Sequence, residues 1–126
     1  MTALIFPGQG SQYIGMTKDF HDEFVIARET FEKIENSVEI NLRDIIFTNK
    51  SELLNITKYT QLAIYSSSMS IFNVLRNEID IDKLFIKYSL GHSLGEYSAL
   101  TVSNVISVED CSILLKKKRR INAKCF

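Results

Sequence analysis

A serine lies between two glycines in the segment Gly91-His-Ser93-Leu-Gly95, directly after a short apolar run. This Gly-x-Ser-x-Gly pattern is typical of a nucleophile elbow, a sharp turn from strand to helix that exposes the serine hydroxyl. Ser93 is therefore predicted to be a nucleophile in acyl chemistry. The backbone N–H of Leu94, at the start of the following helix, would stabilise the oxyanion. An ordinary tight turn is the alternative interpretation.

A second glycine-containing segment, "FPGQGSQ" at Phe6–Gln12, follows another short apolar run. Ligands bind at the carboxyl ends of parallel strands, and a loop with two glycines exposes backbone N–H groups there. This loop could donate the second hydrogen bond to an oxyanion. It lacks the third glycine of a dinucleotide fingerprint and the Gly-Lys-Ser/Thr of a P-loop, so nucleotide binding is the weaker hypothesis.

A serine nucleophile needs a general base, and the chain has only two histidines, His21 and His92. His92 adjoins Ser93, and neighbouring side chains at a sharp turn point apart, so its imidazole would need unusual geometry to reach the hydroxyl. His21 lies beside the polar edge of an amphipathic segment, where a solvated surface position is expected. The base is therefore predicted to lie outside this sequence.

Strand and helix patterns alternate along the chain. The apolar runs Thr2–Phe6 and Leu84–Leu90 predict two buried strands. Apolar residues at three- and four-residue steps predict helices over Asp19–Ile34 and from a Thr60 cap to about Arg76. Further helices are expected at Asn41–Phe47, after the serine turn, and after a capping box that begins at Ser107. The fold class is predicted to be α/β, with a parallel sheet flanked by helices.

Composition limits the partners. With 126 residues, 45% of them apolar, the chain can bury one core, as a small domain or as part of a larger one. Fifteen basic and fifteen acidic residues give no general attraction to nucleic acid or membrane. No apolar run approaches the roughly 18 residues of a membrane span. Two cysteines, Cys111 and Cys125, without a secretory signal predict a reduced, cytoplasmic protein.

Three segments together resemble one family. "FPGQGSQ", "YTQLAIYSSSMSIF" and "GHSLGEYSAL" are similar to segments of the malonyl-CoA:acyl carrier protein transacylases of fatty acid synthesis. The resemblance spans all 126 residues, whereas family members are usually more than twice as long, so it implies a truncated, N-terminal part of an acyltransferase domain at 1–126. It implies an incomplete parallel sheet flanked by helices, in a hydrolase-like core with a nucleophile elbow. It also implies ping-pong transfer of malonate from CoA to a serine and then to the thiol of acyl carrier protein, without metal or redox cofactor.

The resemblance assigns roles to particular positions. It implies an acyl-carrying nucleophile, two oxyanion amides and a pocket-lining glutamine, which are Ser93, the backbone N–H groups of Gln9 and Leu94, and Gln61. Lys118 stands where the family has an arginine that pairs with the malonate carboxylate, and Arg119 is beside it. Lysine is a point charge rather than a bidentate fork, so malonyl selectivity would suffer unless Arg119 takes the role. The family's catalytic histidine falls beyond Phe126.

Several interpretations stay open. The basic run Lys116–Arg120 fits a solvated helix end whose cations complement the helix dipole. Attraction to CoA phosphates or to an acidic carrier protein is the functional alternative, and nucleic-acid binding is the least favoured interpretation.

The chain is expected to be an acyltransferase segment with little activity alone, for which a separately encoded C-terminal segment would supply the base. A non-catalytic remnant or interaction module that binds carrier protein or a partner chain is the second hypothesis. A serine esterase is disfavoured by the position of "FPGQGSQ".

Overall fold

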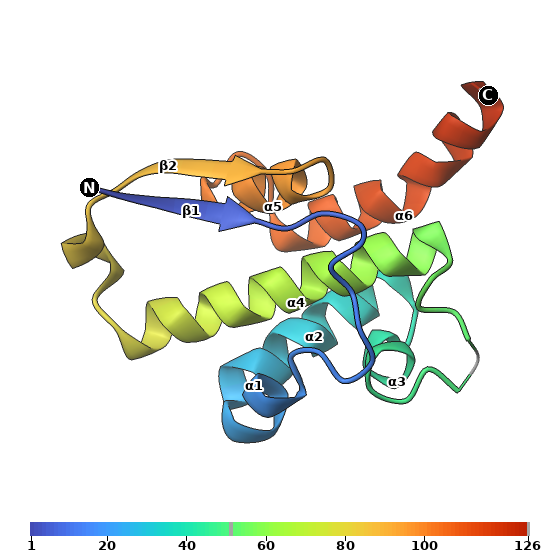
Figure 1. Cartoon of the computed structure of the whole chain (residues 1–126), viewed down its shortest axis with the longest axis horizontal. Coiled ribbons are helices and arrows are strands. Elements are labelled where there is room, and N and C mark those ends of the chain that lie inside the picture. Colours follow the sequence, from blue (N-terminus) through green and yellow to red (C-terminus); the bar gives the residue numbers. More distant parts are fainter. Residues whose placement is uncertain (51, 126) are drawn as a thin grey trace.

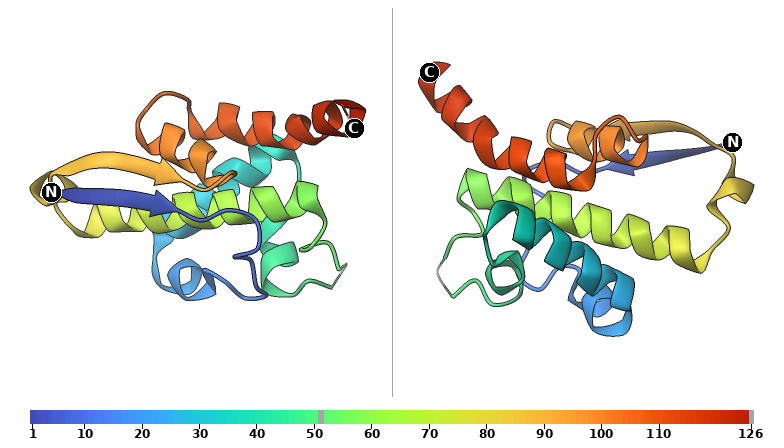
Figure 2. Two further views of the ribbon diagram at one scale, coloured as in Figure 1. Left: turned by 45° about the horizontal axis from the view of Figure 1, so that its top comes forward. Right: turned by 180° about the vertical axis from the view of Figure 1, so that it is seen from behind.

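The computed structural model describes residues 1–50 and 52–125, with side chains described as far as Lys118. The elements in chain order are β1 (Thr2–Phe6), α1 (Lys18–Glu23), α2 (Val25–Val38), α3 (Leu42–Phe47), α4 (Thr57–Glu78), a 3-10 helix η1 (Ile81–Leu84), β2 (Ile86–Gly91), α5 (Gly95–Val102) and α6 (Val108–Cys125). The long helix α4 runs between the two strands and the layer formed by α1, α2 and α3 (Figures 1 and 2). Helix α5 packs against both strands, and α6 packs against α2 and α4. The predicted α/β class is confirmed.

The strands β1 and β2 pair in parallel, so that their carboxyl ends lie side by side. The register runs from Thr2 opposite Ile86 to Phe6 opposite Gly91. The second strand starts two residues later than predicted because Phe85 takes a left-handed conformation, with φ of 49°, after η1.

The prediction that both strands are buried is wrong for much of the sheet. Ile5 is 76% exposed and Leu90 is 53% exposed, and Tyr88 is also open to solvent. Parallel sheets are normally covered on both faces. Within the described residues, exposed Ala3 and Ile5 alternate along β1 with Leu4 and Phe6, which are at least partly buried, so one face of this strand is left uncovered.

The prediction of one continuous helix over Asp19–Ile34 is wrong, because the structure has two helices there. Phe24 is extended, with φ of −114° and ψ of 122°, and separates α1 from α2. The guanidinium of Arg28 donates hydrogen bonds to the carbonyls of His21 (2.6 Å) and Asp22 (3.1 Å), which compensates the carbonyl groups freed at the break. The apolar stripe itself is buried as predicted in α2, where Ala27, Phe31 and Ile34 are fully covered.

Helix α4 begins at Thr57, so the predicted N-cap role of Thr60 is wrong. Thr60 is buried inside the helix, and its hydroxyl donates to the carbonyls of Leu54 and Ile56. These bonds fasten the preceding loop to the helix. Beyond Thr60, every residue from Leu62 to Ser70 is buried, because α4 has neighbours on all sides. The small serines in this stretch allow those neighbours to approach closely.

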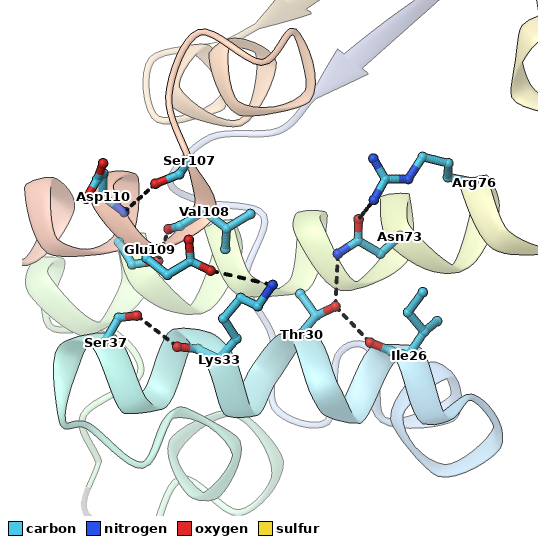
Figure 3. A network of polar contacts seen from close by, with 11 residues as sticks. Ile26, Thr30, Lys33, Ser37, Asn73, Arg76, Ser107, Val108, Glu109 and Asp110 are labelled. Carbon is cyan, nitrogen blue, oxygen red and sulfur yellow. Dashed lines mark hydrogen bonds and ion pairs between the residues drawn. The ribbon is translucent and has the colours of Figure 1, made fainter.

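Side-chain contacts tie α4 and α6 to α2 (Figure 3). The amide of Asn73 on α4 donates to the hydroxyl of Thr30 on α2 over 2.9 Å. Lys33 on α2 forms an ion pair with Glu109 on α6, with 3.5 Å between Nζ and Oε1. Because Thr30 is buried while the ion pair is largely exposed, the Asn73–Thr30 bond contributes more to the packing than the ion pair does.

Two predicted helix starts are confirmed by side-chain caps. Asn41 accepts a hydrogen bond from the N–H of Asp44 at the start of α3 (3.3 Å). Ser107 accepts one from the N–H of Asp110 at the start of α6 (3.1 Å). Both caps satisfy amides that have no partner within their own helix.

Replacing Thr60 by valine should lower the free energy of unfolding by about 1–3 kcal/mol, because two carbonyls next to a buried position lose a donor while the side-chain shape is kept. Urea denaturation followed by circular dichroism measures the change. Thr57→Val, at an exposed position one turn earlier, is the matched control and should stay within about 0.5 kcal/mol. Equal effects of the two substitutions would contradict the role given to Thr60.

Candidate active site

Ser93 lies in the turn that joins the end of β2 to the start of α5. The residue is exposed, and its backbone is in the left-handed region, with φ of 53°. A non-glycine residue in this region costs on the order of 1 kcal/mol and persists only where its surroundings hold it there. The chain therefore makes a sharp strand–turn–helix connection with the serine at its tip, as the sequence predicts.

Two short backbone bonds and two glycines close this turn. The N–H groups of Gly95 and Glu96 donate to the carbonyls of His92 and Ser93, each over 3.0 Å. A Cβ atom placed on Gly91 would lie 1.9 Å from the carbonyl carbon of Gly95. The strand and the helix thus approach at a distance that excludes any side chain at position 91.

The loop after β1 presses directly against this turn. The N–H of His92 donates to the carbonyl of Phe6 over 3.2 Å. A Cβ on Gly95 would lie 2.2 Å from that same carbonyl oxygen, and a Cβ on Gly8 would lie 2.3 Å from the carbonyl oxygen of His92. The two glycine-containing motifs, far apart in sequence, therefore form one backbone-to-backbone contact at the carboxyl end of the sheet.

The two amides predicted to hold an oxyanion both belong to this contact region. Leu94 occupies the N-cap position of α5, and its side chain is fully buried, which anchors the turn in the core. Gln9 lies in the exposed loop, next to Gly8. Among the residues that the structure describes, neither N–H donates to a backbone or side-chain acceptor. Their joint role as oxyanion donors stays a prediction.

The remaining predicted site residues are Gln61, Lys118 and Arg119, which do not belong to the contact between the loop after β1 and the serine turn. Gln61 is partly buried near the start of α4, and its side chain makes no hydrogen bond within the described part of the chain. Lys118 on α6 places its Nζ 4.6 Å from the centre of the Tyr97 ring on α5. The side chain of Arg119 lies outside the described residues. The sequence motifs assign no role to Tyr97, although an aromatic residue in the first turn of the helix after Ser93 is a signal for one.

Neither histidine side chain forms a hydrogen bond with the Ser93 hydroxyl within the described structure. The prediction of a solvated His21 is wrong, since its side chain is only 19% exposed and its ring meets the Phe47 ring edge-on, with 5.1 Å between centroids. The chain breaks at Phe24, and His21 belongs to the short helix α1 that precedes the break. Helix α1 lies on the opposite side of α4 from β2 and α5 (Figures 1 and 2). His92 is exposed, and its ring nitrogen lies beside Gly8.

An apolar cavity of about 540 Å³ lies next to the sheet rather than at Ser93. It is bounded by β1, the following loop, α1 and α4, and its lining includes Leu4, Phe6, Ile64, Phe72 and Leu75. Ser67 also lines it, with a hydroxyl that is buried and has no hydrogen-bond partner in the described structure. The cavity borders the uncovered strand β1, and Ser93 is not among its lining residues.

The described residues contain no helix with the length and hydropathy that a membrane span requires. Their histidine, cysteine, aspartate and glutamate side chains form no group of three or more that could hold a metal ion.

Comparison with known proteins identifies the family. The acyl transferase domain family matches residues 3–125, and the chain belongs to that family. Its relatives include the malonyl CoA-acyl carrier protein transacylases of Staphylococcus aureus (strain MRSA252), 34% identical over 125 residues, and of Bacillus subtilis, 36% identical over 116 residues. They cover 99% and 92% of this chain, respectively. The resemblance inferred from the motifs is confirmed.

Solved structures agree. The acyl-carrier-protein-S-malonyltransferase of Bartonella henselae superposes on 92% of the chain with a TM-score of 0.84 and 40% identity. A malonyl-transacylase in complex with a type II polyketide acyl-carrier protein superposes on 90% of it, with a TM-score of 0.81 and 32% identity. The chain spans 39% and 28% of the lengths of the two curated relatives and 37% and 36% of these two structures.

Gly95→Ala should lower the free energy of unfolding by about 1–3 kcal/mol, because the added Cβ would push β1 away from α5. Chemical denaturation measures the loss. Glu96→Ala changes an exposed neighbour in the same helix and should stay within about 0.5 kcal/mol. An unchanged stability in Gly95→Ala would show that the close contact between Phe6 and α5 does not exist in solution.

Proposed function

We propose that this chain carries the nucleophile of a malonyl-CoA:acyl carrier protein transacylase of fatty acid synthesis, as the N-terminal part, 1–126, of an acyltransferase domain. The observation that carries this proposal is the strand–turn–helix geometry, in which Ser93 is held at a positive φ against the loop after β1. Membership of the acyl transferase family and the names of the relatives support the substrate class. The soluble substrates fit a cytoplasmic location.

The proposed reaction has two symmetrical halves. The Ser93 hydroxyl attacks the thioester carbonyl of malonyl-CoA and gives its proton to a base, and CoA leaves as its sulfur takes a proton. The thiol of acyl carrier protein then attacks the seryl ester, and Ser93 regains its proton. Serine, base and oxyanion donors are sufficient for this chemistry, so no metal or redox cofactor is proposed.

The amides of Gln9 and Leu94 are proposed to hold the oxyanion in both halves. Their support is the direct contact between the loop after β1 and the serine turn, and the lack of another acceptor for either N–H in the described structure. Backbone donors fixed before the reaction need no reorganisation when charge develops on the oxygen. Gln61 is proposed to line the acyl pocket, and Lys118, with Arg119 beside it, to attract the malonate carboxylate.

The general base is proposed to come from residues outside this chain, either a separately encoded C-terminal segment or another part of the same protein. Neither His21 nor His92 is placed to take the proton of Ser93. The uncovered sheet face and the apolar cavity beside β1 provide a surface on which such a segment could pack. The length of the relatives, more than twice that of this chain, supplies enough residues for it.

A non-catalytic interaction module is the second candidate. The uncovered apolar sheet also suits a chain whose role is to bind carrier protein or a partner. The lack of a hydrogen bond between Ser93 and either histidine side chain in the described structure favours this candidate. The two candidates differ in whether Ser93 becomes acylated.

The chain alone, incubated with malonyl-CoA, should form a trace malonyl ester on Ser93 but show no sustained transfer to carrier protein. Oxyanion stabilisation contributes about 10²–10³-fold without a base, whereas the missing base forfeits about 10²–10⁴-fold. Intact-protein and peptide mass spectrometry detect the ester. Ser93→Ala is the control and should carry none.

Three outcomes would contradict this proposal. Equal malonylation of Ser93→Ala would show that the label is not on the proposed nucleophile, and a complete lack of ester on the unchanged chain would favour the interaction module. Ser93-dependent turnover by the chain alone at an ordinary enzyme rate would place the base within this sequence.

A further inference from the structure

The ammonium of Lys118 is not free in solvent but lies over an aromatic ring. Its Nζ is 4.6 Å from the centroid of Tyr97, the shortest of the five such cation–ring contacts in the described residues. Both residues are partly buried, at the place where α5 and α6 pack together. A cation within about 6 Å of a ring centroid is attracted by the negative face of the ring.

Tyr97 is itself held firmly. Its backbone N–H donates to the carbonyl of Leu94 over 3.0 Å, within the first turn of α5. Its carbonyl accepts a hydrogen bond from the hydroxyl of Thr101 over 2.8 Å. The buried Tyr65 hydroxyl is bonded in turn to that same Thr101 hydroxyl, over 2.8 Å. The pKa of Tyr65 is raised by burial, so this phenol stays neutral and the network stays intact at physiological pH.

Lys116 and Lys118, two cations of the basic run Lys116–Arg120, differ in what holds them, and the Tyr97 ring is the contact that limits the movement of Lys118. Lys116 donates to the carbonyl of Val38 at the end of α2 over 2.6 Å, so this cation is occupied by the helix terminus. A lysine side chain has a flexible four-carbon stem and, unlike arginine, no rigid fork that fixes its charge in space. The ring of Tyr97 restricts the position of the Lys118 ammonium. The attraction to the ring does not consume all three N–H donors of the ammonium, so donors remain available for a carboxylate.

We propose that Tyr97 is a positioning residue that fixes the ammonium of Lys118 beside α5, the helix that follows the serine turn, and thereby gives the site a preference for acyl thioesters with a free carboxylate. This inference rests on the proposed function of Ser93 as the acyl acceptor. Tyr97 lies in the first turn of α5, where the N–H groups of Glu96 and Tyr97 donate to the carbonyls of Ser93 and Leu94, each over 3.0 Å, so these hydrogen bonds join the helix that holds the ring to the serine turn. The lysine would otherwise sample many positions and lose most of its preference.

The test compares three variants of the whole chain, Tyr97→Phe, Tyr97→Leu and Lys118→Met, after each is shown by circular dichroism to be folded. Each protein is given equal malonyl-CoA and acetyl-CoA, and mass spectrometry measures the ratio of malonyl to acetyl ester on Ser93. Tyr97→Leu should lower the ratio about 2–5-fold, the effect of a partly exposed cation–ring contact. Lys118→Met should lower it at least as far, and Tyr97→Phe, which keeps the ring, should leave it unchanged.

A second measurement does not depend on acylation. In proton–carbon NMR, the ε-methylene signal of Lys118, assigned by its loss in Lys118→Met, should be shifted upfield by the ring, and the shift should persist in Tyr97→Phe and vanish in Tyr97→Leu. An unshifted signal in the unchanged chain would overturn the inference. So would an ester ratio that is equal in Tyr97→Leu and the unchanged chain. Absence of any ester on the unchanged chain, with the upfield shift present, would instead overturn the proposed function of Ser93 and, with it, the carboxylate preference.

Discussion

The structure depends on one contact in which backbone meets backbone with no side chain between. The end of β1 and the turn after β2 approach so closely that a Cβ at Gly8 or Gly95 would overlap a main-chain atom on the other side, and a Cβ at Gly91 would overlap Gly95 within the turn. Parallel pairing of the two strands brings their carboxyl ends together, and the three glycines then let the loop and the turn touch. The exposed position of Ser93 and the direction of α5 both follow from this contact.

The helices serve to hold this contact in place. Helix α4 is surrounded by other elements and gives the chain a core, while Leu94 and the Tyr65–Thr101 bond fasten α5 to that core. The positive φ of Ser93 is tolerated because the turn is fixed on both sides. The least covered part is the sheet itself, whose apolar side chains meet solvent. Further residues packed on this face could supply the catalytic base. The uncovered sheet and the exposed Ser93 would then both be explained by the same additional segment.

Patterns among residues that are near one another in the sequence were enough to predict much of the fold and the position of Ser93. The two strands, the turn at Ser93, and the caps at Asn41 and Ser107 depend on residues close together in the sequence, and the glycines identify where close approach is needed. What could not be predicted depends on contacts between distant residues. The break at Phe24 arises although the apolar period continues through it, and the bonds from Arg28 that compensate it come from the next helix. The buried roles of His21 and Thr60 and the contact of Lys118 with Tyr97 likewise require tertiary packing.

The central claim is that this chain holds a functional nucleophile that lacks only its base. Its most direct test is the rate of malonyl transfer to acyl carrier protein when the chain is mixed with a polypeptide carrying the part of the Staphylococcus aureus relative beyond the region that this chain matches. The account predicts turnover that rises with the concentration of the added polypeptide and disappears in Ser93→Ala. If saturating polypeptide, shown to bind the chain, produced no Ser93-dependent turnover, the claim would be contradicted.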